Sequence, residues 1–312
     1  MSDATRRGRP GGLARRLRGR TVRSMTSSPG VVVGAVILLI LLIGAAFAPW
    51  IATTNPYNPA SLDLMNANLP PAWLAGSDPH FLLGTDDQGG DLLSLMLFGL
   101  RTSLVVGVLA VGVSLVIGLI AGLVAGYERG WIDTLIMRIA DVQFTFPAIL
   151  LALLIGGISR MLLPESARAS SALLLVVASL GIAHWPHFAR IVRGATLVEA
   201  RKDYVAAARL IGHGRWFIVL QCILPNVLNG VFVLGMLDIA FAIMGEATLS
   251  FLGFGLPPTQ PSLGTLIRLG YNNLFSGQWW VVIFPSLLLV VLIVAINAVG
   301  DWLRIMLNPR LR

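Results

Sequence analysis

Six apolar blocks run through the sequence, and they limit the chain to folds that cross a lipid bilayer. Each block is close to the roughly 20 residues that a helix needs to span the hydrocarbon core. The chain is 56% hydrophobic and only 12% charged, whereas soluble domains carry roughly 25% charged residues. We therefore expect an all-α membrane protein with six transmembrane helices, at residues 31–50, 104–126, 134–157, 172–188, 224–245 and 280–302.

The polar stretches between these blocks divide the chain into five segments. Residues 1–29 form a basic tail, residues 30–50 the first transmembrane helix, and residues 51–100 a proline-containing loop on the outer side. Residues 101–305 hold the remaining spans in one membrane domain, and residues 306–312 form a short tail.

The first apolar block has two interpretations. It follows eight arginines and ends near Ala46-Phe47-Ala48, which resembles the cleavage site of a signal peptide. Its length reaches that of a full span and exceeds the usual apolar core of a signal peptide. We therefore favour an uncleaved signal anchor.

The distribution of basic residues predicts the orientation. With both ends of the chain in the cytosol, only four of the 23 basic residues lie outside: Arg101, Arg160, Arg168 and Arg268. Cytosolic loops of membrane proteins carry such an excess of arginine and lysine. Because the positive charge flanks apolar spans, it argues for a membrane and against nucleic acid as the partner.

The sequence holds no recognisable site for a nucleotide, a disulfide or a metal. Lys202 is the only lysine, and it stands between Arg201 and Asp203 where the phosphate-binding P-loop needs Gly-Lys-Ser/Thr, so that motif is absent. Cys222 is the only cysteine, and the pair His184 and His187 is too small a set for a closed metal site. We expect this chain to bind no cofactor and not to be an enzyme.

Three glycines at intervals of four suggest a packing face in the second span. Glycines on one helical face allow two backbones to approach closely in lipid. A generic enrichment of glycine in membrane helices is the alternative, but the regular spacing favours a helix-packing role. The three residues are Gly118, Gly122 and Gly126.

Three acidic residues lie within or at the ends of spans and are candidates for the translocation path. Asp238 is near the middle of the fifth span, where an ionisable residue is a functional candidate by default. It either faces a solute or pairs with a polar group of a companion subunit. Asp141 either faces the path or pairs with Arg138, three residues earlier, and Glu246 ends the fifth span near the outer surface.

A basic loop at residues 199–226 separates the fourth and fifth spans. Asp203 is a plausible N-cap, the alanines 206–208 give a thin helix, and Gly212 ends it. A short helix with a small-residue face fits a groove in another protein. The alternative is a surface helix that only joins two spans.

The same loop carries a resemblance to a known family. Tyr204-Val-Ala-Ala-Ala-Arg209-x-x-Gly212, followed by Leu224-Pro225-Asn226, resembles the coupling loop of ABC importer permeases with a type-1 transmembrane domain. The resemblance runs from about residue 83 to 312, and the chain is most similar to the C-type permease subunit of dipeptide/oligopeptide importers, a group with nickel-importing relatives. Further matching segments are Leu83-Gly84-Thr85-Asp86, Gly99-x-Arg101-x-Ser103-Leu104 and Leu249-Ser250-Phe251-Leu252-Gly253.

The resemblance implies a division of labour in the bacterial cytoplasmic membrane. One or two ABC ATPase subunits use ATP and Mg, and a second homologous permease completes the membrane part. An extracytoplasmic binding protein delivers the solute, and we expect residues 246–278 to meet it. The implied function is ATP-driven import of di- or oligopeptides, with nickel or another small solute as the alternative.

The resemblance also assigns residues to the contact with the ATPase. The implied contacts are mostly apolar, because Val205 stands where the family usually has an acidic residue, and Arg209 and Arg215 are expected at the rim. An ion-driven secondary transporter predicts inverted repeats, and an intramembrane enzyme needs a nucleophile with a base; neither pattern is seen. The ATPase-coupling residues are Asp203, Tyr204, Val205, Ala206, Ala207, Ala208, Arg209, Leu210, Gly212 and Pro225.

Overall fold

The computed structural model describes residues 29–58 and 62–307, and these residues fold into helices without a β-strand. The basic tail at residues 1–28 and the last five residues, 308–312, lie outside the described part. The helices, in chain order, are α2 (Pro29–Ala46), α3 (Ala48–Ile51), η2 (Leu64–Asn66), α4 (Leu92–Glu128), α5 (Gly130–Phe144), α6 (Ala148–Leu162), α7 (Glu165–Glu199), α8 (Asp203–Leu210), α9 (Arg215–Phe217), the π-helical turn η3 (Ile218–Ile223), α10 (Leu224–Phe251), α11 (Leu263–Asn273), η4 (Leu274–Ser276) and α12 (Trp280–Leu307).

The expected all-α membrane fold is confirmed. Among the described residues, five helices are long and apolar enough to cross a membrane, namely α2, α4, α7, α10 and α12. The third predicted span is divided into α5 and α6, which meet at a 90° bend and give a sixth span when counted together. Pro147 explains the break, because it has no N–H to continue the helix and disfavours helical geometry at the preceding residue.

Two helices, α4 and α7, exceed their predicted apolar blocks by the most residues. The helix α4 begins at Leu92 because the Asp91 side chain accepts a hydrogen bond from Ser94 N at 3.0 Å and caps the first turn. Its first turns therefore lie within the range expected to be an outer loop. The helix α7 continues through Pro186 to Glu199, beyond the predicted end at residue 188.

The helices α4 and α7 form the most extensive helix pair of the described residues. A Cβ atom on Gly118 would lie 2.4 Å from Phe188 Cβ, and one on Gly122 would lie 2.6 Å from Ala189 O. A Cβ atom on Gly126 would meet α7 in the same way. The three glycines therefore lie on the face of α4 where the two backbones approach closely.

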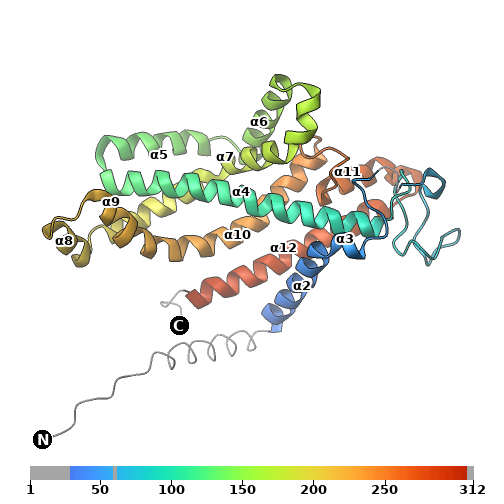
Figure 1. The fold of residues 1–312 in the computed structure, drawn as a ribbon, viewed down its shortest axis with the longest axis horizontal. Helices are drawn as coiled ribbons and strands as arrows, with labels where there is room; N and C mark the ends of the chain where they lie inside the picture. The colour runs from blue at the N-terminus through green and yellow to red at the C-terminus, as the bar shows by residue number, and fades with distance from the viewer. Residues whose placement is uncertain (1–28, 59–61, 308–312) are drawn as a thin grey trace, which may run out of the picture.

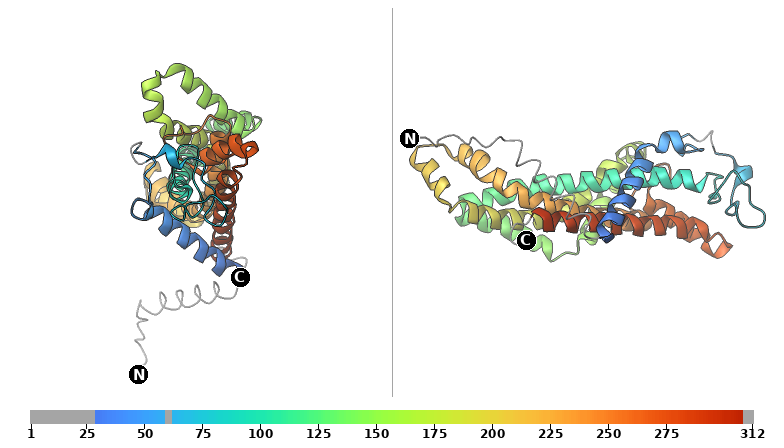
Figure 2. Two further views of the ribbon diagram at one scale, coloured as in Figure 1. Left: turned by 90° about the vertical axis from the view of Figure 1, so that its right-hand side faces the viewer. Right: turned by 90° about the horizontal axis from the view of Figure 1, so that it is seen from below.

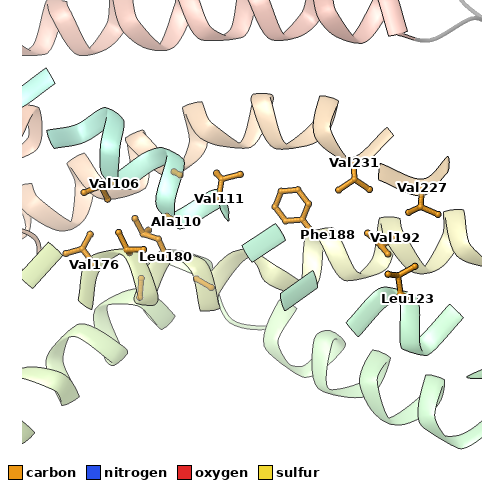
Figure 3. Packing of buried hydrophobic residues seen from close by; sticks show 14 of the residues in the cluster. Val106, Ala110, Val111, Leu123, Val176, Leu180, Phe188, Val192, Val227 and Val231 are labelled. Carbon is orange, nitrogen blue, oxygen red and sulfur yellow. The ribbon is translucent and has the colours of Figure 1, made fainter. Parts of the chain in front are cut away.

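An apolar core fills the space between α4, α7 and α10, as Figure 3 shows. Phe188 is its largest fully buried side chain. On the other side of α10, α12 packs against both α10 and α2. The helix α2 approaches α12 at Gly34, where an added Cβ atom would lie 2.7 Å from Ala298 Cβ.

The elongated bundle has two different ends (Figure 1). One end carries α8 and α9, and the opposite end carries α3, α11 and the segment before α4; we call these the α8 end and the α11 end. Figure 2 shows the same separation from two further directions. Segments 199–226 and 246–278 therefore serve opposite ends of the molecule.

Glu246 lies in a buried polar cluster that joins α4, α10 and α11. It is fully buried and accepts hydrogen bonds from Ser103 Oγ at 2.8 Å and Ser250 Oγ at 2.6 Å. Ser103 Oγ in turn accepts a bond from Leu263 N at 3.2 Å, at the start of α11. The hydrogen bonds of the carboxyl group are thus satisfied within the chain and without contact with water.

Candidate functional site

The helix α8 lies in the loop between α7 and α10. Lys202 occupies the N-cap position, and no side chain caps the helix. The sequence predicted Asp203 as the N-cap. In the structure Asp203 is instead the first residue of α8. Its charge still lies in the first turn and Arg209 lies in the last turn, which are the favourable ends for these charges on a helix dipole.

Gly212 ends α8 in a left-handed conformation with φ of +91°. The N–H of His213 donates to Ala208 O at 3.1 Å, and the N–H of Gly212 donates to Arg209 O at 3.0 Å. This pair of bonds is a Schellman motif, which favours glycine at the left-handed position. The predicted end of the helix is therefore found at Gly212, for the reason proposed from the sequence.

Tyr204 ties α8 to the ends of both neighbouring spans. Its hydroxyl donates to Glu199 Oε1 at 2.5 Å and accepts from Asn226 Nδ2 at 3.1 Å. Lys202 Nζ lies 2.7 Å from the other oxygen of Glu199. Burial, and after it the bond to Glu199, raises the pKa of Tyr204 to about 12. The hydroxyl group therefore stays protonated and able to donate at physiological pH.

The chain enters α10 through the π-helical turn η3, which ends two residues before Pro225. Proline has no N–H and its ring conflicts with a carbonyl one turn earlier, so a widened turn before it accommodates the ring. Asn226 Nδ2 donates to Cys222 O at 2.9 Å and satisfies one carbonyl group in this turn. Pro225 and Asn226 thus shape the junction between the loop and the span.

One face of α8 is buried inside the chain. Val205 is fully buried and Ala208 is 8% exposed, and both belong to the core cluster that includes Ile218 and Ile223. Val205 was expected to contact the ATPase, but its side chain faces the protein interior. Its apolar character suits this core position and offers no surface to another subunit in this structure.

The opposite side of the loop exposes large apolar side chains at the α8 end. Leu210 is 89% exposed, Ile211 75% and Trp216 77%. We call these three residues the apolar tip. Exposed apolar side chains grouped in this way are typical of a protein–protein contact.

Two arginines connect the loop to the end of α4. The guanidinium group of Arg209 lies 5.6 Å from the centroid of the Tyr127 ring, within range of a cation–π interaction. Arg215 Nη1 lies 3.5 Å from Glu128 Oε2. The two arginines thus contact the chain itself, and their place at the rim of the ATPase contact stays a prediction.

The other two acidic candidates have different surroundings. Asp141 Oδ1 accepts a hydrogen bond from Arg190 Nη2 at 3.0 Å, so its partner lies on α7 and is not Arg138. Both side chains are more than half exposed. Asp238 lines a cavity of about 390 Å³ together with His184 and His187.

Sequence reasoning missed the partners that fold back from distant positions. The bonds of Tyr204 to Glu199 and Asn226 join residues separated by five and 22 positions, and no local pattern marks such pairs. The contact of Arg190 with Asp141 spans 49 positions. Among the described residues, no group of three or more His, Cys, Asp or Glu side chains is placed to hold a metal ion.

Comparison with protein families gives two matches that together cover most of the chain. Residues 90–312 match the family described as "Binding-protein-dependent transport system inner membrane component". Residues 17–71 match the family described as "N-terminal TM domain of oligopeptide transport permease C".

Similar curated proteins align over most of their length and of this chain. The di/tripeptide transport system permease protein DppC of Pseudomonas aeruginosa is 36% identical over 290 residues, which cover 93% of this chain and 91% of that protein. The dipeptide transport system permease protein DppC of Escherichia coli K12 is 41% identical over 283 residues, covering 91% and 90% respectively.

Solved structures share the fold at low sequence identity. A chain of the MetNI methionine ABC transporter in an inward-facing conformation superposes with a TM-score of 0.54 at 22% identity, over 69% of this chain and 96% of that chain. A chain of an amino acid ABC transporter with histidines has a TM-score of 0.51 at 18% identity, over 67% and 92%.

Proposed function

The chain belongs to the family of binding-protein-dependent transport system inner membrane components, and we propose that it is the permease subunit of an ABC importer for di- and oligopeptides. The observation that carries the proposal is the alignment of nearly the whole chain with dipeptide permeases from different bacteria. The helical bundle supports it, because its fold is that of type-1 importer permeases. The protein is a multi-pass protein of the inner membrane.

The division of labour between the subunits follows from the absence of a nucleotide-binding motif in this chain and from the partner subunits of the family. The sequence has no P-loop lysine, so ATP and Mg are used by one or two partner ATPase subunits. A second homologous permease and an extracytoplasmic binding protein complete the importer. In this arrangement the α8 end and both chain termini face the cytosol, and the α11 end faces the binding protein.

The loop at 199–226 is the contact with the ATPase in this proposal. The apolar tip inserts into a groove of the ATPase, as short apolar helices do in other complexes. Movement of the ATPase passes to α7 and α10 through Tyr204, and to α4 through Arg209 and Arg215. Those spans then move relative to the second permease, so that the solute path opens alternately to the outside and to the cytosol.

We expect Leu210→Ala to weaken the binding of the ATPase about fivefold. Leu210 is 89% exposed, so its truncation leaves the core of this chain intact, while an apolar anchor at the centre of an interface contributes more than about 1 kcal/mol. Co-purification of the ATPase with the tagged permease at graded ATPase concentrations measures the effect.

Met65→Ala is the matched control for this measurement. Met65 is also 89% exposed but lies in the segment before α4, at the opposite end of the bundle. Binding of the ATPase to the Met65 variant is expected to equal that of the wild type. Equal weakening by both substitutions would contradict the assignment of the apolar tip.

Uptake into vesicles tests the function as a whole. The complete importer, purified with its companion subunits and reconstituted, is expected to accumulate radiolabelled dialanine when ATP and the binding protein are supplied. Labelled nickel ions are offered in a parallel sample, and no accumulation is expected. Uptake of nickel without uptake of dialanine would overturn the assignment of a peptide substrate.

A further inference from the structure

A cavity of about 390 Å³ lies beside the break between α5 and α6. Its walls come from three parts of the chain: the break itself, the middle of α7 and the middle of α10. A space of this size holds several water molecules or part of a small solute. The residues that define its chemistry are Gln143, Phe146, His184, His187, Asp238 and Phe241.

Asp238 is the only carboxylic acid among the residues that line this cavity. It is 8% exposed, and among the described residues no donor lies within hydrogen-bonding distance of its Oδ2 atom. A buried carboxyl oxygen without a partner is unfavourable, and at membrane depth an ionisable residue marks a functional site by default. The unsatisfied oxygen therefore points to a ligand that the chain itself does not supply.

Two of the neighbouring polar groups, Gln143 and Arg190, are already engaged with other partners. Gln143 Nε2 donates to Ile182 O at 2.5 Å and to Ala183 O at 3.2 Å, and Gln143 Oε1 accepts from Trp185 Nε1 at 2.9 Å. Arg190 pairs with Asp141. Neither the amide group nor this guanidinium group is thus free to serve Asp238.

We propose that this cavity binds the primary ammonium group of the transported solute, with Asp238 as its counter-ion. The inference rests on the proposed function, since the amino terminus of a peptide is such a group. An ammonium group provides three donors and forms a charge-assisted bond with a carboxylate. The rings of Phe146 and Phe241, which also line the cavity, are suited to a cation–π contact.

The surroundings favour an ammonium group over a metal ion. Asp238, His184 and His187 line the same cavity, but among the described residues no group of three or more His, Cys, Asp or Glu side chains is arranged to hold a metal ion. His184 and His187 each bring ring nitrogens that donate or accept hydrogen bonds, which suits the amide and carbonyl groups next to the amino terminus of a peptide. The cavity thus offers Asp238 to the ammonium group, and His184 and His187 to the peptide group next to it.

The variant Asp238→Asn tests this site in the complete importer. It removes the charge at nearly constant volume and breaks no hydrogen bond within the described residues. Uptake of labelled dialanine into vesicles is expected to fall about tenfold, as loss of one charge-assisted bond predicts. Stimulation of ATP hydrolysis by the loaded binding protein is expected to stay within about twofold of the wild type, because Asp238 lies in the middle of α10 and the apolar tip lies in the loop before that helix.

Two further variants make the comparison specific. Asp238→Glu keeps the charge and is expected to recover part of the uptake. Asp301→Asn removes an exposed carboxylate from α12, outside the cavity, and is expected to leave uptake unchanged. If Asp238→Asn transports dialanine like the wild type, or loses stimulated ATP hydrolysis together with uptake, the proposed site is overturned.

A binding measurement does not depend on the turnover of any variant. Saturation-transfer NMR on the wild-type complex in nanodiscs is expected to give a signal for dialanine and a much weaker one for N-acetyl-dialanine, which has no ammonium group. Equal signals from the two probes would overturn the ammonium site while leaving the proposed function intact. Absence of dialanine uptake by the wild-type complex would instead refute the proposed function, and the inference with it.

Discussion

Substitution of Gly118 by valine is expected to prevent stable folding of the bundle. An added Cβ atom would lie 2.4 Å from Phe188 Cβ, 2.8 Å from Trp185 O and 2.9 Å from Ala189 N. Two of these three atoms belong to the backbone, so no change of rotamer makes room. Overpacking of a tight core costs about 3 kcal/mol in such a case, which is about a hundredfold in the folding equilibrium.

The amount of monodisperse permease recovered in detergent, and its thermal unfolding midpoint, measure this effect. Gly112→Val is the matched control, because Gly112 lies on the same helix and an added Cβ atom there would meet nothing within 4 Å. Both substitutions carry the same change in helix propensity, so their difference isolates packing against α7. Normal yield and stability of the Gly118 variant would contradict the close approach of α4 and α7.

Substitution of Gly212 by valine is expected to uncouple ATP hydrolysis from uptake. Gly212 has a φ of +91° and nothing within 4 Å of an added Cβ atom, so the substitution acts on backbone conformation alone. A β-branched residue in the left-handed region costs about 2 kcal/mol. The Schellman motif that ends α8 is then lost in most molecules, and the apolar tip changes direction. Uptake of dialanine is expected to fall about 30-fold, while the permease inserts and assembles.

Gly214→Val is the control for this variant. Gly214 lies two residues later and also has nothing within 4 Å of an added Cβ atom. Its backbone is extended, with φ of −65° and ψ of 159°, and valine adopts this conformation readily. Gly212→Asn is expected to have a smaller effect, because asparagine tolerates the left-handed region better. Similar uptake by the Gly212 and Gly214 valine variants would show that the end of α8 has no part in coupling.

The family and the fold class could be predicted from the sequence, and the comparisons confirm both. Membrane spans are marked by the length of apolar runs, and the glycines 118, 122 and 126 by their helical spacing. Both signals are local and periodic. The end of α8 at Gly212 was equally readable, because a glycine that follows a helix is a local signal for a left-handed cap.

What the sequence could not give are the features that depend on side chains from distant positions. From the sequence, Glu246 was predicted at the end of a span. In the structure it is buried and accepts hydrogen bonds from serine hydroxyl groups of α4 and α10. Val205 reads as a surface substitution in a docking motif, yet it lies in the core. The predicted span began only at Leu104, whereas α4 begins at Leu92, where the Asp91 side chain caps the first turn. Hydropathy describes each residue by itself and carries no information on the side chains that surround it in the folded protein.

The sealed cluster around Glu246 has a mechanical consequence. An acid that depends on Ser103 of α4 and Ser250 of α10, and that is linked through Ser103 to the start of α11, loses its partners if any of these helices slides against the others. The penalty for exposing it unpaired to an apolar interior makes such sliding unfavourable. The bonds around Glu246 therefore hold α4, α10 and the start of α11 in one fixed arrangement at the α11 end of the bundle.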